Sequence, residues 1–136
     1  MNRTFAMAVA LGLAGILPSA FGQAVVGNYY NPYGVYGGGH ASFNSAGYDC
    51  SGSVSFALHG AHLLATPLDS TQFESYGDPG RGRWITLYAN AGHVFMDVAG
   101  LWFDTAAQSA QNGNDRWSAT RVSPGNGWVI RHPAGW

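Results

Sequence analysis

One cysteine and a histidine–aspartate pair have the side-chain types and the spacing that covalent catalysis requires. Cys50 is the only cysteine in 136 residues, so it cannot pair within the chain. A lone cysteine forms an intermolecular bridge, stays an inert buried thiol or acts as a reactive group. We favour the reactive thiol, because Cys50 opens an apolar, helix-compatible run and a helix N-terminus stabilises negative charge.

A cysteine nucleophile needs a base and a group that orients the base. His93 begins one expected strand and Asp104 lies near the end of the next, after a turn at Ala99–Gly100. Because an antiparallel hairpin places strand starts opposite strand ends, the two can be cross-strand neighbours. If the helix N-terminus packs there, Cys50 joins them and its main-chain amide supplies an oxyanion donor. Asp97 is the competing carboxylate, but it lies farther along the strand of His93.

One helix and several strands must position these groups. Asp49 is a good N-cap, which leaves Cys50 as the first residue of a helix over 50–60. Spacings of three and four residues predict that one stripe of this helix faces the core: Val54, Ala57 and Leu58.

The rest of the chain predicts a short helical turn followed by antiparallel strands. Asp69 or Ser70 caps the turn, and residues 78–82 are expected to form a loop. Aromatic and β-branched residues predict strands at 83–89, 93–98, 101–105 and 128–132, with a short segment at 116–119. A helix that precedes an antiparallel run of strands indicates an α+β fold.

The first 24 residues have the composition of a secretory signal peptide. An early arginine precedes an uncharged apolar run over 5–17, and small residues follow it. The run is shorter than the roughly 20 residues of a membrane-spanning helix, so we expect no span after signal removal. Residues 25–136 suffice for one domain, secreted or retained in the periplasm or cell envelope. The net charge is −1 and no basic patch appears, which argues against a nucleic-acid partner.

Three motifs resemble the NlpC-like cysteine endopeptidases of bacterial cell walls. They are an aromatic-Gly-Gly motif at 36–38, the Asp-Cys-Ser-Gly motif within 47–54 and Gly-His-Val at 92–94. Ser-Thr-Gln at 70–72 matches that family loosely. The resemblance spans residues 30–105.

The resemblance implies a compact papain-like fold with Cys50 as nucleophile, His93 as base and Asp104 as the orienting residue. The family commonly has histidine in the third role, so aspartate is a substitution. A tyrosine before the Gly-Gly motif often contributes to the oxyanion hole, and Tyr33 and Tyr36 are the candidates here. His40, which follows the glycine turn, is a further candidate for the cleft.

The resemblance also implies a function: an exported hydrolase that cuts an amide bond in peptidoglycan stem peptides, between D-glutamate and a diamino acid. We expect a monomer without a cofactor, acting on a peptidoglycan peptide. Two alternatives stay open: a catalytically silent wall-binding module on the same fold, and an exported amide hydrolase or effector with another substrate. His40, His59 and His62 lack a further ligand at matching spacing, so we expect no metal site.

Overall fold

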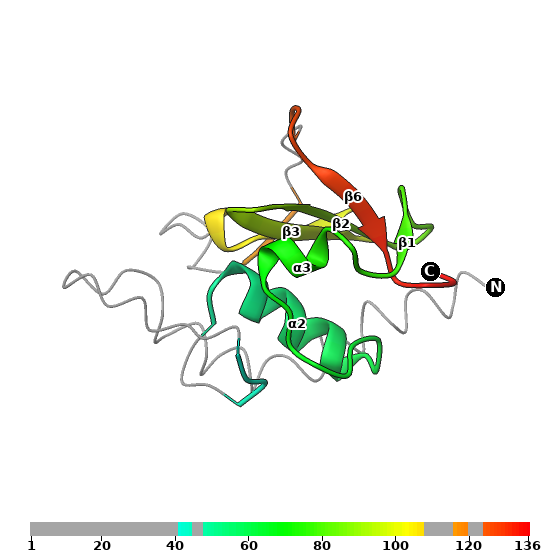
Figure 1. Cartoon of the computed structure of the whole chain (residues 1–136). Coiled ribbons are helices and arrows are strands. Elements are labelled where there is room, and N and C mark those ends of the chain that lie inside the picture. Colours follow the sequence, from blue (N-terminus) through cyan, green and yellow to red (C-terminus); the bar gives the residue numbers. More distant parts are fainter. Residues whose placement is uncertain (1–40, 45–47, 108–115, 120–123) are drawn as a thin grey trace.

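The structure is a computed structural model, and it describes residues 41–44, 48–107, 116–119 and 124–136 (Figure 1). The predicted signal peptide over 1–24 lies outside the described residues. Within the described ranges, no helix has both the length and the apolar character needed to cross a membrane.

Among the described residues, two helices precede all six strands, and both begin as the sequence predicts. Helix α2 (Cys50–Gly60) has Asp49 as its N-cap. Helix α3 (Ser70–Phe73) starts with a capping box, in which Asp69 and Gln72 each accept the other's main-chain N–H. Such caps satisfy amide groups that the first helical turn leaves without partners.

The strands form one six-stranded antiparallel sheet in the order β1-β6-β2-β3-β4-β5. Their bounds are β1 (Asp78–Pro79), β2 (Ile85–Asn90), β3 (His93–Val98), β4 (Leu101–Phe103), β5 (Trp117–Ser118) and β6 (Val129–His132). The α+β class predicted from the sequence is therefore confirmed. The C-terminal strand β6 inserts between β1 and β2 and pairs with both.

Several sequence-based assignments were wrong, most by one or two residues at a strand end. Asp78–Pro79, expected in a loop, pairs with β6, a partner more than fifty residues away that local turn propensity does not reveal. Strand β2 begins at Ile85, two residues later than expected. Strand β4 ends at Phe103, and a 3-10 helix η1 (Thr105–Ala107) follows. The Asp104 carboxylate accepts the Ala106 N–H, a local bond that competes with strand pairing.

The two faces of the sheet carry separate apolar clusters. Both helices lie on one face, with α2 against β3 and α3 against β2 (Figure 1). The predicted helix stripe is buried there with alternate β3 residues: Val54, Ala57, Leu58, Val94, Met96 and Val98. A second cluster contains Tyr88, Phe95 and Trp102, with Trp128 and Ile130 packed against it. Successive side chains along β3 point to opposite faces of the sheet. His93 is the first residue of this strand.

Candidate active site

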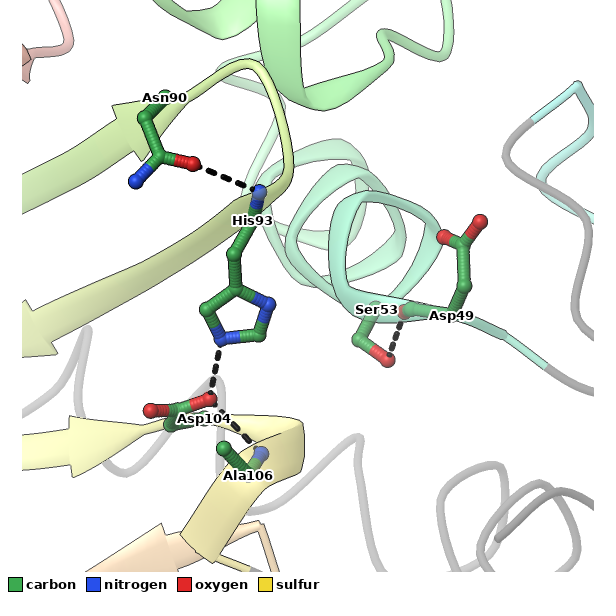
Figure 2. Close-up of polar contacts among 6 residues, drawn as sticks. All are labelled: Asp49, Ser53, Asn90, His93, Asp104 and Ala106. Carbon is green, nitrogen blue, oxygen red and sulfur yellow. Dashed lines mark hydrogen bonds and ion pairs between the residues drawn. The ribbon is translucent and has the colours of Figure 1, made fainter. Parts of the chain in front are cut away.

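The local structure around Cys50 is a capped helix start. Asp49 has extended backbone geometry, and its Oδ1 accepts the Gly52 N–H at 2.7 Å. The Asp49 carbonyl accepts the Ser53 hydroxyl at 2.7 Å (Figure 2). Cys50 is thus the first helical residue, where the main-chain N–H has no intrahelical acceptor. Its thiol is free and partly exposed.

The main chain of His93 is fixed by the turn between β2 and β3. The Asn90 side-chain oxygen accepts the Gly92 N–H at 2.9 Å. The same oxygen accepts the His93 N–H at 2.9 Å (Figure 2). The Ser70 hydroxyl at the start of α3 donates to the Ala91 carbonyl at 3.2 Å. The turn is therefore held by its own asparagine and by the second helix, which limits where the imidazole can lie.

The His93 ring and the Asp104 carboxylate form a direct contact. His93 Nε2 lies 2.8 Å from Asp104 Oδ1, and the same oxygen accepts the Ala106 N–H at 2.8 Å. The paired register of β3 and β4, continued by one residue, places Asp104 opposite Phe95 and diagonal to His93. Side chains reach such diagonal neighbours in an antiparallel sheet. The predicted proximity of His93 and Asp104 is confirmed.

His93 also interacts with Cys50. Its pKa is raised from 6.5 to about 9, first by the hydrogen bond to Asp104 and next by a hydrogen bond with the Cys50 side chain. Burial of the ring acts in the opposite direction, and the charges of both partners raise the pKa further. Since Nε2 faces Asp104, the other ring nitrogen faces the start of α2 (Figure 2). The candidate site therefore consists of the His93 imidazole between the Asp104 carboxylate and the start of α2, which carries the Cys50 thiol.

Aromatic rings border the imidazole. His93 lies edge-on to Trp128, with ring centroids 6.2 Å apart, and Trp128 packs edge-on to Phe95 at 4.9 Å. The Trp128 indole N–H donates to the Pro124 carbonyl at 2.6 Å. Side-chain exposure is 27% for His93 and 19% for Asp104, so the pair is shielded but still reachable from solvent.

Sequence reasoning missed two residues that shape this site. Asn90 lies between the strands predicted at 83–89 and 93–98 and was given no role, although an asparagine followed closely by the candidate base is a signal for a side chain that binds nearby amides. Trp128 was assigned to a strand, and no local pattern links it to His93. The contact between Trp128 and His93 depends on the insertion of β6 beside β2.

The other candidates have different positions. Tyr33, Tyr36 and His40 lie outside the described residues. The Asp97 carboxylate accepts the Gly100 N–H at 2.7 Å at the far end of the hairpin. His59 stacks on Phe43 and its Nδ1 lies 2.9 Å from the Leu64 carbonyl.

No metal-binding arrangement was found in the described part of the chain. Groups of three or more histidine, cysteine, aspartate or glutamate side chains in suitable positions do not occur among those residues. His62 has a positive φ of 59° just beyond α2. A left-handed conformation is uncommon for a residue other than glycine and here reverses the chain after the helix.

Searches of the chain against protein-family models, curated proteins and solved structures found no match. The NlpC-like resemblance stays a prediction from the motifs around Cys50 and His93.

Proposed function

We propose that this protein is an exported cysteine hydrolase with a papain-like fold that cleaves an amide bond in peptidoglycan stem peptides. One observation supports this proposal most strongly: His93 Nε2 lies 2.8 Å from the Asp104 carboxylate, and the Cys50 side chain is near enough to the imidazole to raise its pKa. A nucleophile, a base and an orienting group in this order are what acyl transfer through a thioester requires.

The first half of the proposed reaction forms the thioester. The raised pKa of His93 favours the imidazolium. In the proposed reaction, the nucleophile is a Cys50 thiolate paired with this imidazolium. The thiolate attacks the amide carbon, and the main-chain N–H of Cys50 stabilises the developing oxyanion. The imidazolium then donates its proton to the leaving nitrogen as the carbon–nitrogen bond breaks. The first product is an amine, and the acyl group remains on sulfur.

The second half releases the acid. Neutral His93 takes a proton from water as the water oxygen attacks the thioester carbon. The carbon–sulfur bond breaks and regenerates the thiolate beside the imidazolium. Asp104 accepts from Nε2 throughout, so the ring keeps its other nitrogen toward the start of α2. Water is the only co-reactant.

The substrate class rests on the motifs. Asp-Cys-Ser-Gly surrounds the nucleophile and Gly-His-Val surrounds the base, both as in the NlpC-like enzymes. The composition of residues 1–24 supports delivery to the envelope, where peptidoglycan is found. We infer cleavage between D-glutamate and the diamino acid of the stem peptide.

The test is incubation of the purified protein with soluble stem peptides, followed by mass spectrometry. Wild type should release the diamino acid fragment with a new free amine, and Cys50→Ala should release none. A matched peptide with L-glutamate is the control for stereochemistry. Full activity in Cys50→Ala would refute the thioester mechanism. Binding without cleavage would favour a silent wall-binding module, and cleavage of other amides alone would favour a different substrate.

A further inference from the structure

Arg116 is a buried cation beside the candidate site, in a region that the sequence motifs do not cover. It directly precedes β5, and only 1% of its surface is exposed. Arginine is rarely buried to this extent unless its guanidinium has defined partners. The position of those partners therefore indicates what the side chain does.

The contacts of Arg116 reach both chain segments that carry the reacting groups. Its Nη2 donates to the Tyr48 carbonyl at 3.2 Å, and Tyr48 directly precedes the N-cap of α2. Its main-chain carbonyl accepts the Asp104 N–H at 2.9 Å. One residue thus contacts the chain two positions before Cys50 and the backbone of the residue that orients His93.

The residues on both sides of Arg116 are well packed. The Tyr48 side chain is 5% exposed, and its hydroxyl donates to the Phe43 carbonyl at 2.6 Å. The Trp117 ring packs against Phe103, with centroids 4.8 Å apart, directly before Asp104. A link between two well-packed segments transmits position, because neither end can move freely to compensate.

We propose that Arg116 is a positioning residue that sets the placement of the Cys50 thiol relative to the His93–Asp104 pair. This inference rests on the proposed function, in which the thiol and the imidazole must stay in contact. A misplacement of 1 Å can cost about 10²-fold in rate, so loss of the link should be visible in the reactivity of Cys50.

A purely structural role makes a different prediction. If Arg116 only stabilised the fold, a folded variant would keep the reactivity of Cys50 unchanged. Arg131 provides the matched control, because its guanidinium also binds main-chain carbonyls, those of Ser75, Tyr76 and Gly77. None of those carbonyls belongs to the segments next to Cys50, His93 or Asp104.

The experiment measures alkylation of Cys50 by iodoacetamide in the folded full chain across a pH series. Cys50 is the only cysteine, so the label reports on one site. Arg116→Met should lower the alkylation rate about 10- to 100-fold near neutral pH, and a second substitution, His93→Ala, should then have little further effect. Arg131→Met should lower the melting temperature while leaving the rate and its pH profile unchanged.

A wild-type rate and pH profile in folded Arg116→Met would overturn the inference. If that variant does not fold, Arg116→Lys, which has a shorter reach, is measured in its place, and a wild-type rate there would also overturn it. If neither variant folds, Arg116 serves the fold and the inference is withdrawn. If His93→Ala alone leaves the wild-type rate unchanged, the proposed function itself fails, independently of Arg116.

Discussion

The two ends of the β3–β4 hairpin each carry an aspartate, but they use it differently. At the turn, Asp97 Oδ1 accepts the N–H of Gly100, three residues away, at 2.7 Å. At the open end, Asp104 Oδ1 accepts a local N–H from Ala106 and also faces Nε2 of His93 across the strands. The first aspartate is bound to its own turn, and the second joins two strands.

This difference shows what converts a turn residue into a candidate catalytic group. Both aspartates accept a nearby main-chain N–H, which is common for this residue in turns. At the open end, the His93 imidazole lies within hydrogen-bonding distance of the aspartate, and the start of α2 lies beside the hairpin (Figure 2). The position of α2 against β3, rather than residue type, separates the two ends.

The largest expected effect comes from removal of the imidazole at the open end. His93→Ala should reduce amide cleavage by about 10²- to 10⁴-fold, the range that general acid–base catalysis contributes. His132→Ala is the control, because His132 Nδ1 contacts the Gly80 carbonyl in another part of the sheet. Peptide turnover measured by chromatography checks this, and equal losses in the two variants would contradict a special role for the open end.

A smaller effect is expected when each aspartate is replaced in turn. Asp104→Asn removes the first cause of the raised pKa of His93, so this pKa should fall from about 9. Activity should fall about 10- to 100-fold, since hydrogen bonds to charged groups contribute about 1.5–3 kcal/mol. Asp97→Asn keeps an oxygen for the Gly100 N–H and should leave the pKa of His93 unchanged. Histidine titration by NMR measures both, and a similar shift in the two variants would remove the distinction.

The local features of the site could be predicted from the sequence. Asp49, Asp69 and the start of α2 follow from capping rules that involve residues only a few positions apart. The contact between His93 and Asp104 follows from a hairpin with a recognisable turn. In each case the interacting residues lie on one continuous segment.

The features that depend on distant segments could not be predicted. β6 inserts between β1 and β2, and this pairing turns an expected loop at Asp78–Pro79 into an edge strand. The same insertion brings Trp128 to His93. Arg116 reaches Tyr48 across 68 positions. No local period or turn signal encodes such contacts, because they arise from the packing of the whole sheet.

The pH dependence of the free energy of unfolding should also report on His93 at the open end of the β3–β4 hairpin. The pKa of His93 is higher in the folded state, about 9, than the ordinary 6.5, so the imidazolium stabilises the folded protein. This contribution is complete below pH 6.5 and disappears as the pH rises through about 9. It should be on the order of 2 kcal/mol, since one pKa unit corresponds to about 1.4 kcal/mol and solvent screens part of the charge.

Urea unfolding of wild type and His93→Gln at pH 6 and pH 9.5 measures this contribution. The difference between the two proteins should shrink at the higher pH, and an equal difference at both would contradict it. Asp97→Asn should retain the wild-type pH dependence, because its effect lies at the turn.

The smallest expected effect lies at the turn itself. Gly100 has a φ of +94°, and an added Cβ would meet no atom within 4 Å. Gly100→Ala therefore introduces backbone strain without a clash and should lower the free energy of unfolding by about 1–2 kcal/mol. Because the strain lies at the turn, the pKa of His93 and the activity of the folded fraction should not change. A loss of activity beyond the unfolded fraction would show that the two ends of the hairpin are coupled, and the open end would then depend on the turn as well as on α2.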